Sequence, residues 1–496
     1  MRDDLQLDAR VLDRARISRD ARFDGKFFIA VTSTGVYCRP ICPSRTSKPA
    51  NVRYYATAAA AAEAGFRPCL RCRPEAAPGT AAWLGTCAVV NRALRMINDG
   101  ALDDASVESL AARLGVSSRH LHRLFMRHIG ASPNTVAQTR RLHFAKRLLD
   151  ETHLPITHIA LASGFGSVRR FNDAFRATYR RAPRELRAQR RGGERSVDAD
   201  EVVLRLPYRP PYEWRHMAQF LATVAIGGVE LVTPHSYTRT ITTPSGHALV
   251  CVRPREGEHA LELRISGAEP SALVQIASAA RRMFDVAADS GGIDAALGAD
   301  SLVGPLVKRR PGLRIPGAWD PFECAVHCVL AERASPTEAQ ALMARLVARA
   351  GRAIDGPCRS VTHTFPSAVM IAAADLDSLS MPGWKARALD SLVRALLGSE
   401  QATIDSDAVA QALTSSAEVS DWSLQTIALR SLSEPDALPI DERVLLGGAS
   451  AAGTPMSAAE LSRRAEAWRP WRGYAAMQLW SRDGPYEAPL AETRGR

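Results

Sequence analysis

Residues 35–45 read GVYCRPICPSR, and residues 66–74 read FRPCLRCRP. Together they place four of the chain's nine cysteines in two tight pairs, Cys38-x3-Cys42 and Cys69-x2-Cys72, separated by 26 residues. Such two-plus-two spacing is typical of a tetrahedral site that holds one Zn²⁺ through four cysteine sulfurs. The sequence therefore predicts a small zinc domain. Spacing alone leaves open whether the metal is purely structural.

The residues that flank these cysteines form the segments STGVYCRPICPSR and AGFRPCLRCRP, which resemble the N-terminal domain of the Ada adaptive-response proteins. The resemblance implies that the four cysteines hold zinc and that Cys38 is a methyl-accepting thiolate. A methyl group taken from a DNA phosphotriester would make the cluster less negative, and DNA affinity should rise. The phosphate contacts that the resemblance implies are Thr34, Arg45 and Arg67.

Length and composition limit the class of protein. A chain of 496 residues predicts three or four domains, and 46% hydrophobic with 23% charged residues is ordinary globular composition. No apolar run approaches the roughly 18 residues of a membrane span, and the N-terminus lacks a secretory signal. We therefore expect a cytoplasmic protein without membrane contact. Cys324 and Cys328, one helical turn apart beside His327, fit buried helix positions better than a second metal site.

The net charge of +12 is concentrated in one part of the chain. Residues 118–191 alone carry +12, whereas residues 1–117 carry +5 and residues 192–496 carry −5. The basic segment also has apolar residues at helical spacing, which favours a nucleic-acid-binding module over a merely solvated face.

Two helix-turn-helix patterns lie in this region, SVESLAARLGVSSRHLHRLF at 106–125 and ITHIALASGFGSVRRFNDAFR at 156–176. Two such units joined by a long helix suit successive major-groove segments, and they resemble the tandem DNA-binding domain of the AraC family. The resemblance implies double-stranded promoter DNA and RNA polymerase as partners. Arg180 stands where family members usually carry glycine. The predicted DNA-binding side chains are Arg119, His120, Arg123, Ser167, Arg169 and Arg170.

Beyond a Gly- and Arg-rich linker, short alternating strands give way to helical patterns near residue 313. This half resembles the 3-methyladenine DNA glycosylase II family, the AlkA type. The resemblance runs through RPPYEWRHMAQFL, RRPGLRIPGAWDPFECAVHCVLAE and AEAWRPWRGYAAMQLW. It implies base flipping and cleavage of the N-glycosidic bond, with Asp441 as the catalytic carboxylate. Trp422 and Trp480 match base-pocket aromatics, although core packing also explains a buried tryptophan.

Several residues depart from the glycosylase pattern. The segment from Ser416 to Asp421 aligns with a hairpin whose glycines let backbone N–H groups reach a DNA phosphate. Here both glycines are absent, and Glu418 and Asp421 add negative charge. The position of the apolar wedge maps to Arg333, and another pocket aromatic maps to Thr426. Glycosylase activity is therefore left open as retained, weakened or lost.

The sequence thus predicts a multidomain α+β protein. Its function would be that of a bifunctional transcriptional activator and DNA repair enzyme of the alkylation response. One alternative is a non-enzymatic, methylation-sensing transcription factor with a degenerate glycosylase domain, and another keeps the zinc merely structural. The predicted domains are a zinc methyl-acceptor domain at 1–80, an all-α tandem helix-turn-helix domain at 85–187, a linker at 188–201, an α/β subdomain at 202–312 and a helix-hairpin-helix glycosylase-type domain at 313–496.

Overall fold

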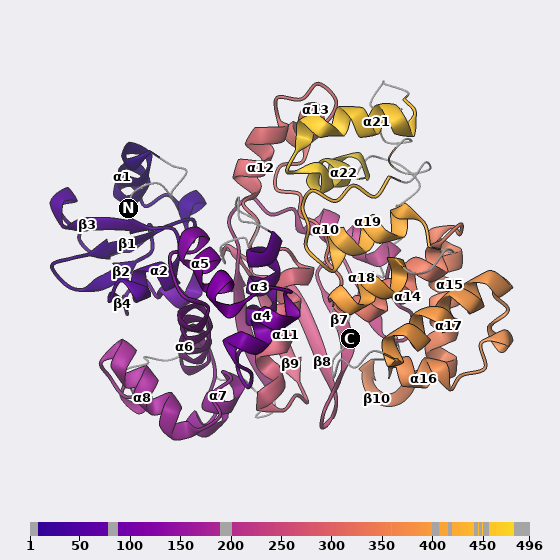
Figure 1. Cartoon of the computed structure of the whole chain (residues 1–496), viewed down its shortest axis with the longest axis horizontal. Coiled ribbons are helices and arrows are strands. Elements are labelled where there is room, and N and C mark those ends of the chain that lie inside the picture. The colour runs from indigo at the N-terminus through magenta and orange to yellow at the C-terminus, as the bar shows by residue number, and fades with distance from the viewer. Residues whose placement is uncertain are drawn as a thin grey trace.

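The computed structural model describes residues 8–77, 88–188, 201–358, 360–398, 406–414, 419–440 and 456–480, with the single residues 445 and 449. It confirms the multidomain α+β class. Figure 1 shows the small sheet of β1 to β4 at one side, helices α3 to α8 beside it, a larger sheet in the middle and a helical region at the other side. None of the described helices combines the length and the apolar character needed to cross a bilayer.

The first part of the chain folds around a four-stranded sheet of order β3-β1-β2-β4. Strand residues alternate between two cores because successive side chains point to opposite faces. Ile29 and Val31 pack with the cysteines and helix α1, whereas Phe28 and Tyr37 pack toward helix α2. The elements are α1 (Ala9–Ser18), η1 (Ala21–Phe23), β1 (Phe28–Val31), β2 (Val36–Cys38), η2 (Pro49–Asn51), β3 (Val52–Tyr55), α2 (Ala58–Glu63), β4 (Arg67–Pro68) and η3 (Pro74–Ala76).

The basic segment forms two helix-turn-helix units on either side of one long helix. Serine hydroxyls cap the helices at Ser106, Ser117, Ser132 and Ser167. Arg180 ends α8 with a φ of 56°, a left-handed conformation that glycine adopts more easily. The helices are α3 (Ala88–Asn98), α4 (Val107–Arg113), α5 (Ser118–His128), α6 (Pro133–Glu151), α7 (Ile156–Ala162), α8 (Val168–Tyr179) and α9 (Pro183–Ala188).

The middle of the chain forms a five-stranded antiparallel sheet of order β5-β9-β8-β7-β6. Its apolar face packs against α10 and α11 in one core. The elements are β5 (Glu201–Pro207), α10 (Trp214–Thr223), β6 (Glu230–Val232), β7 (Tyr237–Thr243), β8 (Gly246–Pro254), β9 (Ala260–Ser266), η4 (Pro270–Ala272), α11 (Leu273–Met283), α12 (Ser290–Leu297) and α13 (Gly304–Arg309).

The C-terminal helices build two further cores. One surrounds α14, and the other joins α12 and α13 to the last helices, which lie together in Figure 1. The elements are α14 (Pro321–Ala331), α15 (Pro336–Ala350), β10 (Arg352–Cys358), β11 (Val361–Thr364), α16 (Ala368–Ala372), η5 (Asp377–Leu379), α17 (Gly383–Leu397), α18 (Ser406–Thr414), α19 (Asp421–Arg430), α21 (Ala458–Ala465), η6 (Glu466–Trp468) and α22 (Arg472–Trp480).

The second helix-turn-helix unit and the five-stranded sheet share one hydrophobic core. Residues of α6, α7 and α8 belong to the same buried cluster as the strands β5, β8 and β9. Polar contacts reinforce this joint, because Arg147 donates to the carbonyl of Arg205 and the Arg205 N–H donates to Glu151 Oε2 at 2.9 Å. The second helix-turn-helix unit is therefore fixed to the sheet.

A buried arginine joins the cysteine-bearing part to the same sheet region. Arg209 is only 2% exposed, and its guanidinium donates to the carbonyl of Asp24 at 2.7 Å and to that of Ala287 at 2.5 Å. Burial lowers the pKa of Arg209 to about 10. A second bridge, Lys26 to Asp289 at 2.5 Å, lies beside it.

Replacing Arg209 should therefore weaken this joint. In Arg209→Ala, two buried carbonyl oxygens lose their donor, which should cost about 2 to 4 kcal/mol. Thermal unfolding of the full chain should show a lower first transition, with faster tryptic cleavage near Asp24. Arg394→Ala is a matched control because that side chain is 77% exposed, and its midpoint should stay at the wild-type value. Equal midpoints for all three proteins would contradict the assigned role of Arg209.

Candidate metal centre and base pocket

Two parallel strands bring the cysteine pairs together. β2 ends at Cys38, and its neighbour β4 leads into Cys69, with Tyr37 opposite Pro68 in the register. The N–H of Cys69 donates to the Tyr37 carbonyl at 2.9 Å, which fixes the two strand ends side by side. The sulfurs of all four predicted ligands lie within 4.8 Å of one another. The structure thus assembles the cluster that the spacing predicts.

The chemistry of this donor set fits zinc. Hydrogen bonding with Cys42 raises the pKa of the Cys38 thiol well above its usual range, whereas hydrogen bonding with Cys38 lowers the pKa of Cys42. Sulfurs this close cannot all be deprotonated when no cation is present, because thiolates repel one another. A divalent cation with a preference for sulfur removes that repulsion. The cluster and the family match below support one zinc ion.

The sulfurs differ in their exposure. Cys38, Cys69 and Cys72 are buried, each at most 8% exposed, whereas Cys42 is half-buried. The N–H of Arg39 donates to Cys72 Sγ at 3.3 Å, and the Arg39 side chain pairs with Asp24. Arg39 therefore helps to hold Cys72 in place, and its guanidinium is paired with Asp24.

The three residues expected to contact phosphate lie on two segments. Thr34 is exposed in the turn before β2, and Arg67 is half-buried on β4, with its N–H bonded to the Gly35 carbonyl at 3.0 Å. The structure therefore places Thr34 and Arg67 at the same end of the sheet. Arg45 is exposed on the loop that follows Cys42.

Most of the predicted DNA-reading side chains are available to solvent. Arg119 and Arg123 on α5 are exposed, and so are Arg169 and Arg170 on α8. His120 is half-buried, and its Nδ1 lies 2.8 Å from an Arg123 nitrogen. Ser167 has a structural task as well, because its hydroxyl accepts from the Arg170 N–H and caps α8.

Part of the predicted base pocket can be described, but Asp441 lies outside the described residues. The ring centroids of Trp480 and Phe220 are 5.7 Å apart. The guanidinium of Arg430 lies over the Phe220 ring, 5.3 Å from its centroid. The indole N–H groups of Trp422 and Trp480 are buried without a hydrogen-bond partner among the described residues. Phe220 and Arg430 were not expected from the sequence, because only the fold brings α10 next to α19 and α22.

The hairpin that departs from the glycosylase pattern is only partly described, since Ser416, Ala417 and Glu418 lie outside the described residues. Ser420 and Ser423 at the start of α19 both donate to the carboxylate of Glu332, which ends α14. Arg333 is exposed, with its guanidinium 5.4 Å from the centre of the Trp384 ring. The Thr426 hydroxyl is buried and has no partner in the described part of the chain.

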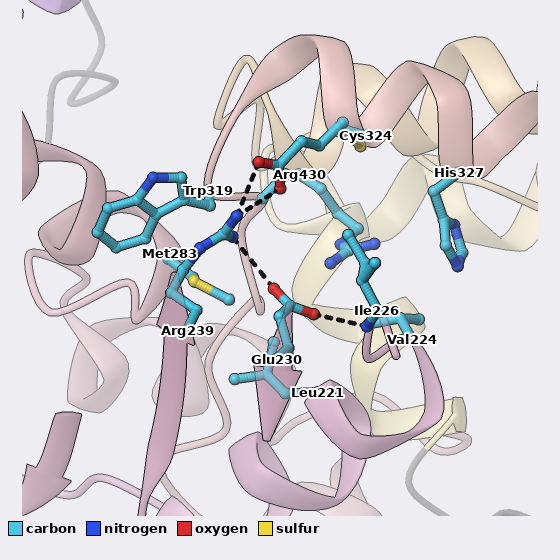
Figure 2. A pocket seen from close by; sticks show the side chains of 12 residues that line it. Leu221, Val224, Ile226, Glu230, Arg239, Met283, Trp319, Cys324, His327 and Arg430 are labelled. Carbon is cyan, nitrogen blue, oxygen red and sulfur yellow. Dashed lines mark hydrogen bonds and ion pairs between the residues drawn. The ribbon is translucent and has the colours of Figure 1, made fainter. Parts of the chain in front are cut away.

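A small cavity of about 30 Å³ lies between the sheet and α14, and Figure 2 shows the side chains that line it. Arg239, 1% exposed, bridges Glu230 on β6 and Glu323 on α14, and burial raises the pKa of Glu323 to about 7. Neither Trp422 nor Trp480 lines this cavity. It is an ion-paired joint between the sheet and the helical region, with room for about one water.

The structure confirms that Cys324 and Cys328 occupy buried positions of helix α14. Cys324 and Cys328 are buried in α14, at 3% and 0% exposure, within the core of the helical region. Burial lowers the pKa of the neighbouring His327 to about 3, which keeps this histidine neutral. The described residues offer no metal-ligand cluster here, only the four-cysteine cluster of the first sheet.

Fold and site together define a protein with a four-cysteine metal centre, a tandem helix-turn-helix, a five-stranded sheet and a helical C-terminal region. Residues 12–75 match the metal binding domain of Ada, residues 110–189 match a helix-turn-helix domain, and residues 203–320 match the AlkA N-terminal domain. These matches follow the order of the parts in the fold.

Relatives cover the chain almost end to end. It is 38% identical to the probable bifunctional transcriptional activator/DNA repair enzyme AlkA of Mycobacterium tuberculosis (strain H37Rv) over 94% of this chain and 95% of that protein. It is 33% identical to DNA-3-methyladenine glycosylase 2 of Escherichia coli over 56% of this chain and 97% of that protein. The Ada enzyme of the same bacterium is 36% identical over 30% of this chain and 40% of that protein. The chain belongs to the family of bifunctional transcriptional activator/DNA repair enzymes of the Ada and AlkA type.

Metal content tests the centre directly. We expect about one zinc per purified chain, and we expect Cys69→Ser with Cys72→Ser to lose it, because two of four sulfur ligands disappear. Elemental analysis of the purified proteins measures this. Cys251→Ser is the control, since Cys251 lies on β8 outside the cluster, and it should keep the full zinc content. Undiminished zinc in the double variant would show that the metal is held elsewhere.

Proposed function

We propose that the protein repairs methylated DNA and uses the repaired lesion as the signal for transcription. The observation that carries this proposal is the four-cysteine cluster on β2 and β4, joined in one chain to two exposed recognition helices and a glycosylase-type half. Its surroundings support the same function, because arginines border the cluster and DNA is a polyanion. We place this activity in the cytoplasm.

The proposed repair step is methyl transfer to Cys38. When bound, zinc keeps the four sulfurs deprotonated, so that a nucleophilic thiolate is available near neutral pH. The Cys38 thiolate attacks the methyl carbon of a DNA methylphosphotriester. A sulfur–carbon bond forms and the oxygen–carbon bond breaks, with its electron pair remaining on the phosphate as a diester anion. The product is a thioether, and no leaving group restores the thiol, so each chain reacts once.

Methyl transfer also changes how the protein meets DNA. One negative thiolate becomes a neutral thioether, so repulsion between the cluster and the DNA backbone decreases. Thr34, Arg45 and Arg67 would then contact phosphates more effectively. The two recognition helices would read promoter bases through Arg119 and Arg169 and bring the protein to RNA polymerase.

The C-terminal half would excise alkylated bases such as 3-methyladenine. In this proposal Asp441 stabilises the positive charge that develops on the sugar, and Trp422 and Trp480 stack on the flipped, electron-poor base. The contact of Trp480 with Phe220, and of Phe220 with Arg430, supports an aromatic wall at this place.

A second candidate is a methylation sensor whose glycosylase half no longer catalyses. The start of α19 favours it, because a protein carboxylate occupies the position where a hairpin would offer N–H groups to DNA. The polar residues Arg333 and Thr426, in place of an apolar wedge and a pocket aromatic, point in the same direction.

Peptide mapping tests the repair step. After incubation with DNA that carries methylphosphotriesters, the mass added by one methyl group (one CH₂) should lie on Cys38 alone. This modification should persist, because the transfer is irreversible. Cys38→Ser should take up no methyl group, whereas Cys251→Ser should react like the wild type. A methyl group on Cys42, the more exposed sulfur, would overturn the choice of Cys38.

Base release tests the second activity. The full chain should free 3-methyladenine from alkylated duplex DNA, and Asp441→Asn should slow release by about 10² or more while DNA affinity is unchanged. Asp375→Asn is the matched control, because it removes one exposed carboxylate by the same substitution elsewhere. If the wild-type protein frees no alkylated base, the sensor replaces the enzyme as the function of this half.

A further inference from the structure

A carboxylate from α14 lies at the N-terminus of α19. Glu332 Oε1 accepts three hydrogen bonds there, from the Ser420 N–H at 2.9 Å, the Ser420 hydroxyl at 2.6 Å and the Ser423 hydroxyl at 2.6 Å. Glu332 is only 6% exposed. The first turn of α19 is therefore in contact with a buried anion of the protein itself.

This contact differs from the capping of neighbouring helices. α14 is capped by Asp320 beside its own first turn, and α15 is capped by Ser335 with Glu338. Ser420, the N-cap residue of α19, makes no side-chain capping bond to its own helix. Instead its partner Glu332 lies 88 residues away in the sequence. The Ser420 hydroxyl is thus held by a tertiary contact and not by its own helix.

A helix N-terminus attracts anions because its first N–H groups lack helical partners and the helix dipole is positive there. A phosphate could use the same donors that Glu332 uses. The two anions cannot occupy the place together, because they would meet within contact distance in a partly dehydrated environment. Glu332 and a DNA phosphate are therefore competitors for the start of α19.

We infer that Glu332 is an internal substitute for the DNA phosphate, which closes the α19 N-terminus to the duplex. The exposed carboxylate of Asp421 in the first turn adds to the exclusion of DNA. Arg333 follows Glu332 directly, but its guanidinium lies over the Trp384 ring and not at the start of α19. The helical region thus holds DNA without a phosphate on α19.

This inference rests on the proposed DNA-binding function, and binding rather than base release tests it. The probe is a labelled undamaged duplex, titrated with the zinc-loaded full chain at several salt concentrations. Glu332→Gln removes the charge, and a phosphate can displace its neutral amide from the Ser420 donors. We expect its affinity at low salt to rise roughly threefold to tenfold. Its dependence of log affinity on log salt should steepen by about 0.9, the value for one additional phosphate contact.

Two controls test whether the salt dependence is set by the negative charge at the start of α19 or by the net charge of the protein. Glu332→Asp keeps the negative charge at the helix start and should bind with the wild-type slope. Asp375→Asn removes one exposed carboxylate from another segment, so it matches the change in net charge and should also keep that slope. The inference is overturned by a Glu332→Gln slope equal to that of the wild type, or by an equal steepening in Asp375→Asn.

Amide hydrogen exchange of the wild-type protein tests the same inference without any variant. The Ser420 amide should exchange at the same rate with and without DNA, because Glu332 already accepts its N–H. Slower exchange on addition of DNA would mean that a phosphate reaches α19, and the inference would fail. Base release from alkylated DNA, measured on the same preparations, decides separately whether the half is an enzyme.

Discussion

The buried ammonium of Lys146 holds the N-terminal half of the molecule together. It lies in the middle of α6, 4% exposed, and its Nζ is 3.4 Å from Glu75 and 2.5 Å from Asp150. A buried charge is tolerated only with such partners, because removing one partner leaves the other dehydrated and unpaired. Glu75 follows Cys72, the last cysteine of the metal cluster, whereas α6 joins the two helix-turn-helix units. One ion-paired cluster therefore fixes the metal centre against the helices.

The same helix explains how a chemical change at sulfur can reach other parts of the chain. Tyr37 precedes Cys38 on β2, and its hydroxyl lies 2.8 Å from His143 on α6. On the opposite side of the cluster, Arg39 pairs with Asp24, whose carbonyl accepts from the buried Arg209 of the sheet region. Tyr37 thus contacts α6 directly, whereas Arg39 is linked to the sheet region through Asp24. A flexible tether would transmit nothing of this kind.

The sequence was most informative where chemistry depends on spacing. Two cysteine pairs predict one cluster because few residues separate the ligands, and the parallel pairing of β2 and β4 then completes it. Serine caps and turn glycines likewise marked the helix-turn-helix units. Contacts between distant segments carry no such local signal. The neighbours Phe220 and Arg430, the bond from Glu332 to Ser420 and the shared core of α6 with β5 depend on tertiary packing alone.

The charge is unevenly divided between the helix-turn-helix region and the C-terminal half. Residues 118–191 carry +12, whereas residues 192–496 carry −5. In the proposed function, attraction to the DNA backbone therefore comes from the recognition helices, because the net charge of the glycosylase-type half opposes it. A half that bound every duplex tightly would hold the activator away from its promoter, since undamaged sites far outnumber it. If Glu332 closes α19 as proposed, one sequence-independent contact is removed and the choice of site is left to the metal centre and the recognition helices.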